Sequence, residues 1–135
     1  MKRYLVVLSM AVAALVGVGT TLYAHHSFAA TYREDESVTI QGELVQFQFR
    51  NPHSFVHLKV TEKDGTVRRY SAEWGGSSQL GGQGVNAQTL KVGDKVQITG
   101  APARGFPGEP RVRLVTLKLL DSNYEWGKKA GETVN

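Results

Sequence analysis

The sequence contains no cysteine among its 135 residues. This absence excludes disulfide bonds, thiolate metal sites, a cysteine nucleophile and the lipid-bearing cysteine of a lipoprotein. The glycine-rich motifs that bind nucleotide phosphates are also missing, and Gly75-Gly76-Ser77-Ser78-Gln79 lacks the final glycine of a serine nucleophile elbow. The sequence therefore argues against cysteine enzymes, nucleotide-binding proteins and serine hydrolases, and the fold must be held by noncovalent packing.

A hydrophobic run long enough to span a bilayer is likewise missing. The apolar stretch at residues 4–18 covers about 15 residues, whereas a membrane-spanning helix needs about 20. Two cations, Lys2 and Arg3, precede the stretch, which is the layout of a secretory signal peptide. We expect residues 1–24 to be removed on export. The processed chain then has no stable membrane span and resides in the periplasm or outside the cell.

The rule of small residues before a signal-peptidase site predicts a cut after Ala24, so that His25 becomes the first residue of the processed chain. A second candidate cut follows Ala29, where Ser27 and Ala29 fit the rule, but this site lies farther from the apolar stretch. The choice matters because a cut after Ala29 removes both His25 and His26. We predict the cut after Ala24.

Processing leaves enough chain for one domain with its own core. We predict a leader at residues 25–37, a β-barrel domain at residues 38–120 and a polar C-terminal tail at residues 121–135. Without Lys2 and Arg3 the formal charge falls from +4 to +2, because 14 of the 16 basic residues remain against 12 acidic ones. This small excess gives no support for nucleic-acid binding, and we expect no nucleic-acid partner.

Apolar residues of the processed chain recur mainly with a period of two, which predicts half-buried strands separated by turns. Five strands are predicted, at residues 38–49, 53–62, 67–74, 95–100 and 111–120. The apolar parity changes between Leu44 and Val45, which indicates a bulge in the first strand. Five strands with one short helical turn favour a mostly β, OB-like barrel over a seven-stranded sandwich.

The segment between the third and fourth strands has no periodicity. Residues 75–84 contain five glycines, which predicts a flexible connection rather than an element. Asn86 then fits the N-cap of a helical turn at residues 87–90. We place the short helical turn of the barrel there.

Strand alternation also assigns side chains to two faces. Seven residues are predicted to be buried in the core: Val56, Leu58, Val60, Tyr70, Trp74, Val96 and Ile98. Arg69, Glu73 and Gln97 alternate with them and should face water. On this assignment Glu43 and Glu73 are solvated strand carboxylates rather than a catalytic acid/base pair.

Five motifs occur together and in order: His25-His26-Ser27-Phe28, Val38-Thr39-Ile40-Gln41-Gly42, Asn51-Pro52-His53, Leu90-Lys91-Val92-Gly93-Asp94 and Val96-Gln97-Ile98-Thr99-Gly100. Over residues 25–119 the chain resembles a bacterial exported family of unknown function. Members of that family begin their mature chains with His-His-Ser-Phe, carry an Asn-Pro-His turn before the second strand and end with a Gly-Asp-x-Val-x-x-x-Gly strand. The resemblance implies a small OB-like barrel and no particular activity.

The four histidines are the candidate metal ligands: His25, His26, His53 and His57. As the first residue, His25 can chelate one ion through its α-amine and its imidazole Nδ1, an arrangement called a histidine brace. Nitrogen ligands suit Cu(II), so copper is the predicted cofactor. His53 and His57 share one face of a strand but lie about 13 Å apart along it, at about 3.3 Å per residue. We expect only one of them to join His25.

Structural interpretations stand beside these functional ones. His53 fits a turn residue, His57 fits a solvated strand residue, and an N-terminal polar leader needs no ligand. Phe47, Phe49 and Phe55 permit an aromatic ligand groove, although such residues pack more often in barrel cores. Two functions remain: an exported copper-binding module, or a non-metal barrel that binds a small molecule, peptide or partner protein. No catalytic constellation or substrate is indicated, so a binding protein is favoured over an enzyme. An enzyme stays open as an alternative, because a copper brace can support oxidation chemistry.

Overall fold

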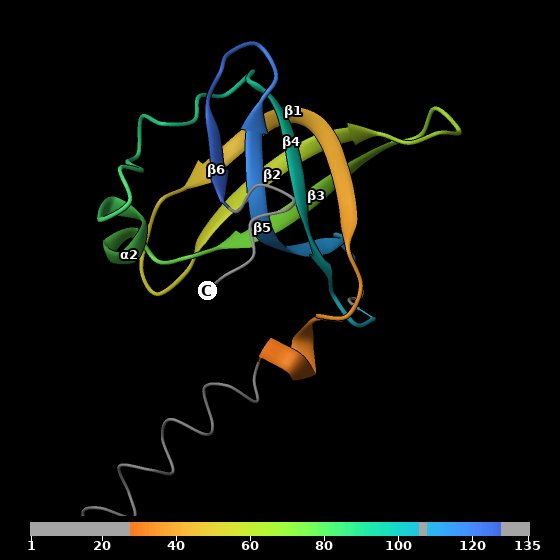
Figure 1. Ribbon diagram of the computed structural model, residues 1–135. Coiled ribbons are helices and arrows are strands. Elements are labelled where there is room, and N and C mark those ends of the chain that lie inside the picture. The colour runs from red at the N-terminus through yellow and green to blue at the C-terminus, as the bar shows by residue number, and fades with distance from the viewer. Residues whose placement is uncertain (1–27, 106–107, 128–135) are drawn as a thin grey trace, which may run out of the picture. The chain divides into compact units, whose positions relative to one another are not determined.

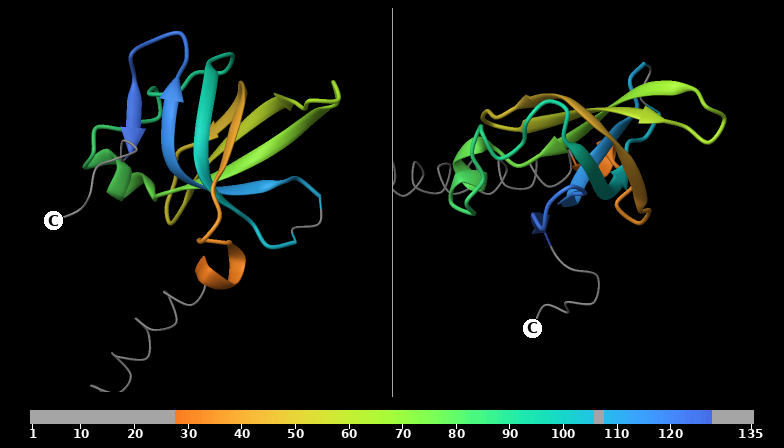
Figure 2. Two further views of the ribbon diagram at one scale, coloured as in Figure 1. Left: turned by 45° about the vertical axis from the view of Figure 1, so that its right-hand side comes forward. Right: turned by 90° about the horizontal axis from the view of Figure 1, so that it is seen from above.

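Six strands form one sheet in the computed structural model, which describes residues 28–105 and 108–127 (Figure 1). The strands are β1 (Val38–Gln48), β2 (Ser54–Thr61), β3 (Val67–Trp74), β4 (Lys95–Pro102), β5 (Arg111–Leu119) and β6 (Glu125–Gly127). Their hydrogen-bonded order is β3-β2-β1-β4-β5-β6, and a parallel pairing of β3 with β5 closes the first five strands into a barrel. The predicted five-stranded OB-like barrel is confirmed, with β6 as an added strand. The β2–β3 hairpin projects beyond the other strands (Figure 2).

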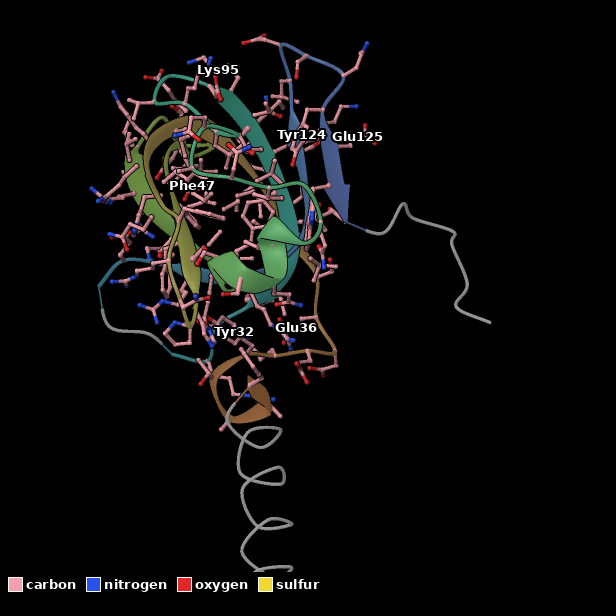
Figure 3. All side chains as sticks on the ribbon, turned by 90° about the vertical axis from the view of Figure 1, so that its left-hand side faces the viewer. Tyr32, Glu36, Phe47, Lys95, Tyr124 and Glu125 are labelled. Atoms are coloured by element: carbon pink, nitrogen blue, oxygen red, sulfur yellow. The ribbon has the colours of Figure 1, made fainter. Side chains whose placement is uncertain are left out.

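The chain divides into two compact units, Met1–Thr31 and Tyr32–Asn135. Of the first unit the structure describes residues 28–31, which form a single helical turn. The second unit holds the barrel and already begins within the predicted leader, with Tyr32 and Tyr124 at opposite ends of the barrel (Figure 3). No helix in the described part of the chain is long and apolar enough to cross a membrane.

A bend in β1 lets this strand pair with strands in both halves of the barrel. Its first half pairs with β4 and its second half with β2, with a register shift after Leu44. The backbone of Leu44 pairs instead with the turn before β4: its N–H donates to the Asp94 carbonyl at 2.8 Å, and its carbonyl accepts from the Gly93 N–H at 2.9 Å. The predicted bulge is therefore confirmed, and the turn before β4 satisfies its backbone groups.

The barrel interior contains the predicted core. Six of the seven predicted residues are at most 6% exposed (Val56, Leu58, Val60, Trp74, Val96 and Ile98). The seventh, Tyr70, is partly buried and packs against them. Trp126 of β6 meets the Trp74 ring edge-on, with centroids 4.9 Å apart. Part of the segment predicted as a polar tail thus forms a strand and covers one end of the core.

The glycine-rich segment at residues 75–84 contains a short helix, α2 (Ser77–Gly81), so the prediction of a bare connection is wrong. Two long-range contacts explain the helix. Leu80 is 1% exposed and packs in the core. The Asn51 side chain accepts a hydrogen bond from the Ser78 N–H at 3.1 Å and donates one to Ser78 Oγ at 2.8 Å. Neither contact leaves a local periodicity in the sequence.

Residues 87–90, predicted as the helical turn, form a hydrogen-bonded turn instead. The Asn86 side chain accepts from the Gln88 N–H at 2.8 Å, and the Asn86 carbonyl accepts from the Thr89 N–H at 3.0 Å. The prediction of Asn86 as a helix N-cap is therefore wrong, because its bonds close one turn and no helix follows. The short helix of the barrel connection is α2.

Candidate functional site

The outer face of β2 carries a row of three rings, His53, Phe55 and His57, which we call the histidine row. Phe55 and His57 alternate with the buried Ser54 and Val56, and His53 directly precedes the strand. This confirms the prediction that the two histidines share one face. Across the sheet, β3 places Glu73 opposite Phe55.

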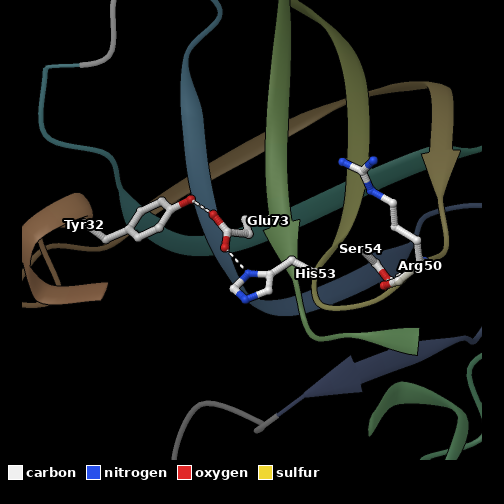
Figure 4. A network of polar contacts seen from close by, with 5 residues as sticks. All are labelled: Tyr32, Arg50, His53, Ser54 and Glu73. Carbon is white, nitrogen blue, oxygen red and sulfur yellow. Dashed lines mark hydrogen bonds and ion pairs between the residues drawn. The ribbon is translucent and has the colours of Figure 1, made fainter. Parts of the chain in front are cut away.

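Glu73 joins His53 to Tyr32 (Figure 4). One carboxylate oxygen of Glu73 pairs with Nδ1 of His53, and the other accepts a hydrogen bond from the Tyr32 hydroxyl. A carboxylate accepts hydrogen, so it favours the tautomer with the proton on Nδ1 and the lone pair on Nε2. The Glu73 side chain is only 12% exposed. The prediction that it faces water is therefore wrong, because Tyr32 and His53 both contact it on the outer face.

Tyr32 belongs to the predicted leader, yet it is 1% exposed and forms an antiparallel bridge with Ala103. Burial raises its pKa well above the ordinary value, and the hydrogen bond and negative charge of Glu73 raise it further, while Arg111 opposes the rise. Tyr32 is thus protonated at neutral pH and acts as a hydrogen-bond donor to Glu73. The network begins one residue after the boundary between the two units.

His57 makes a second histidine–carboxylate pair. Its Nδ1 lies 3.0 Å from Oε1 of Glu109, whose other oxygen forms an ion pair with Arg69 at 3.4 Å. The His57 side chain is 13% exposed, and its Nε2 is buried without a hydrogen-bond partner among the described residues. The interpretation of His57 as a solvated residue is wrong. His53, at 35% exposed, is the more accessible ring.

Phe55 has two cations close to its ring. The guanidinium carbons of Arg50 and Arg111 are each 5.5 Å from its ring centroid, within cation–π range. Phe47 and Phe49 pack against the core instead. The three phenylalanines therefore form no common groove, and the core interpretation holds for Phe47 and Phe49.

Both strand histidines have the partner that metal-binding histidines usually have. A carboxylate on one ring nitrogen orients the ring and directs the other nitrogen to the metal. Within residues 28–105 and 108–127, no three His, Asp or Glu side chains gather closely enough to hold an ion. His25 and His26 lie outside the described residues. Among the described residues, His53 and His57 are each held at Nδ1 by one carboxylate.

Two residues of these networks were not predicted from the sequence. Tyr32 has only one local signal, an aromatic ring in a mostly polar leader, and Glu109 lies in a loop of prolines and glycines with no local signal. Both reach the histidines through contacts far apart in sequence. Such contacts cannot be read from periodicity or spacing.

Residues of the sequence motifs occupy places where backbones approach closely. A Cβ on Gly42 would overlap the Lys59 carbonyl oxygen of β2, and one on Gly100 would overlap the Arg113 carbonyl oxygen of β5. Asn51 ties the β1–β2 turn to α2 through Ser78. These motif residues therefore have structural roles in the barrel.

One family model matches residues 12–109 of the chain, and it describes a family of unknown function, DUF6152. The match covers more than half of the sequence. The chain belongs to this family. No curated protein matches it. The DUF6152 match includes all four histidines together with Glu73 and Glu109, and it ends just before β5.

Proposed function

We propose that this DUF6152 protein is exported to the cell envelope and binds copper at its processed N-terminus. His25 supplies its α-amine and imidazole, and His53 supplies a third nitrogen through Nε2. The observation that carries the proposal is the Glu73–His53 pair, because a carboxylate on Nδ1 is the usual orienting partner of a metal-binding histidine. Three nitrogen donors suit Cu(II) better than the other common divalent ions.

His53 is preferred to His57 for two reasons. Its side chain is 35% exposed, against 13% for His57. Its partner Glu73 also binds Tyr32, which follows His25 by seven residues. This link is short: with residues 28–31 helical, it spans at most about 17 Å.

Export is supported by the two cations before the apolar stretch at residues 4–18 and by small residues at the expected cleavage site. The brace depends on this step, because the α-amine of His25 exists only after a cut at Ala24. In the precursor the same nitrogen is an amide, which is a poor ligand at neutral pH. Export and copper binding therefore form one proposal.

Intact-mass analysis of the chain recovered from the cell envelope, followed by copper analysis after dialysis against equimolar Cu(II), tests this proposal. The expected result is a chain that starts at His25 and retains one copper ion. A start at Ala30 would remove both N-terminal histidines and overturn the proposal. A chain from His25 that retains no copper would also overturn it.

The second candidate function is a barrel that binds a small molecule without metal. One specific observation favours it: a cleft at the end of the barrel has an apolar floor and a cationic rim. This cleft is the basis of the inference that follows.

A further inference from the structure

A cleft of about 720 Å³ lies where β1 separates from the β2–β3 hairpin. The first half of β1 pairs with β4 rather than β2, so the end of β2 and the start of β1 diverge and leave the barrel open between them. The ends of the β4–β5 loop form the remaining wall. The volume falls within the range of small-molecule sites, which often occupy the mouths of β-barrels.

The floor of the cleft is apolar. It contains Ile40, Val60 and Val112, which are 8%, 6% and 2% exposed and belong to the barrel core. Tyr70 adds an aromatic wall. The apolar body of a ligand would contact the exposed part of these side chains and the Tyr70 ring.

The rim of the cleft is cationic. It carries Arg33, Lys63, Arg68 and Arg111 against one carboxylate, Glu62, which is an excess of three positive charges. The whole processed chain has a formal charge of only +2. The charges of the remaining surface therefore nearly cancel, and the local field at this cleft attracts anions.

Arg33 brings an accessible guanidinium to this rim. Its side chain is 42% exposed, and its Nη1 lies 3.3 Å from Glu36. An anion in the cleft can reach the exposed part of this guanidinium. The one carboxylate of the cleft, Glu62, accepts a hydrogen bond from the Tyr70 hydroxyl at 2.5 Å. Glu62 is therefore hydrogen-bonded to the Tyr70 hydroxyl.

Two other clefts lack this combination. In one of them, Lys95 and Glu43 form an ion pair at 2.6 Å that neutralises part of the lining. The other surrounds Trp126, and its one lining cation, Arg113, pairs with Glu34.

We propose that the cleft between β1 and the β2–β3 hairpin binds a small organic anion, a monocarboxylate with an apolar tail. The tail packs on Ile40 and Val112, and the carboxylate accepts hydrogen bonds from Arg33 and Arg68. The site goes beyond the copper proposal, because it uses no histidine and needs no free N-terminus.

Calorimetric titration of octanoate into the processed, metal-free chain with a chelator present tests this site, with octanamide as the neutral analogue of equal length. Octanoate should bind saturably, and octanamide should bind about tenfold more weakly or worse, the equivalent of about 1.4 kcal/mol. The same octanoate affinity is expected for a chain with an added N-terminal Met, which lacks the copper brace. Failure of the copper proposal and failure of this one are thereby distinguishable.

Variants assign the binding to the cleft. Arg33→Gln and the exposed double variant Lys63→Gln with Arg68→Gln should each weaken octanoate binding about five- to tenfold. Lys118→Gln is the matched control, because Lys118 pairs with Glu125 outside this cleft, and its affinity should stay within about twofold of the parent. Lys63 and Arg68 lie on the projecting hairpin, so the double variant should fold like the parent. No saturable binding, equal binding of octanamide, or equal affinities in the rim variants and Lys118→Gln would overturn the proposal.

Discussion

Glu73 illustrates how a single carboxylate can organise a surface. Its side chain is 12% exposed, so its charge is stabilised largely by hydrogen bonds rather than by water. Tyr32 and His53 provide them on separate oxygens. Removal of either partner leaves a largely buried charge with one donor fewer, and such a loss usually exceeds that of a neutral hydrogen bond.

Tyr32→Phe should therefore lower the free energy of unfolding by about 1.5–3 kcal/mol, the usual cost of a lost hydrogen bond to a charged group. Tyr124→Phe is the matched control, since the Tyr124 hydroxyl has no hydrogen bond to another described residue and lies at the opposite end of the barrel (Figure 3). Urea unfolding of the processed chain measures both. An equal loss in the two variants would contradict the role assigned to Tyr32.

For single residues, the sequence predicted the face of the strand on which a side chain lies better than it predicted whether that side chain is buried. Strand alternation placed His53 and His57 on one face and Glu73 on the outer face, and the structure agrees. It could not show that Glu73 is covered, because the covering residue, Tyr32, lies 41 positions away in sequence. It could not find Glu109, which is 52 positions from His57. Contacts of this kind depend on barrel closure.

Strands β4 and β5 pair with a register shift next to Gly100. A Cβ at Gly100 would overlap the Arg113 carbonyl oxygen, and the obstructing atom belongs to the backbone of a central strand. A side chain at this position must therefore push the two strands apart. The last glycine of the Gly-Asp-x-Val-x-x-x-Gly motif has a steric explanation.

Gly100→Ala should destabilise the barrel by about 1–3 kcal/mol, the usual cost of overpacking a tight interior site. Gly81→Ala is the control, because a Cβ there meets nothing within 4 Å and Ala favours the helical conformation by about 0.5–1 kcal/mol. Thermal unfolding of both variants measures the contrast. A Gly100→Ala chain as stable as Gly81→Ala would show that β4 and β5 do not approach as described.

The elements that the sequence predicted are those with an internal pattern. The five barrel strands alternate apolar and polar residues, so their positions and the bulge near Leu44 could be read directly. The helix α2 has only five residues and is held by Leu80 and by Asn51 from another segment. Strand β6 has three residues and is held in place by the contact of the Trp126 ring with the Trp74 ring. Short elements of this kind need the assembled core.

For the whole molecule, alkaline pH reports on the packing of Tyr32, Tyr70 and Tyr124. The pKa of Tyr32 is raised by burial and then by Glu73, that of Tyr70 by its bond to Glu62 and then by burial, and that of Tyr124 by burial. Unfolded tyrosines ionise near pH 10. The folded chain therefore holds more protons than the unfolded chain just above that pH.

The stability that these tyrosines contribute should be fully present below about pH 10 and be lost as the pH rises further. Tyrosinate absorbance and circular dichroism, followed together as the pH is raised, measure the effect. We expect little tyrosinate at pH 10 while the circular dichroism is native, then a joint rise of tyrosinate and loss of structure. Half-complete ionisation near pH 10 in a native chain would contradict the packing of the three hydroxyls.

For the whole molecule, we propose that a processed N-terminus and a carboxylate-held histidine together bind copper. Calorimetric titration of Cu(II) into the processed chain and into the same chain acetylated at its N-terminus tests this proposal, since acetylation converts the His25 amine to an amide and leaves the barrel unchanged. His53→Ala and His57→Ala provide the matched pair on the barrel. We expect one tight site in the processed chain, at least about tenfold weaker binding in the acetylated chain, and a larger loss in His53→Ala than in His57→Ala. Equal affinity in the processed and acetylated chains would overturn the proposal.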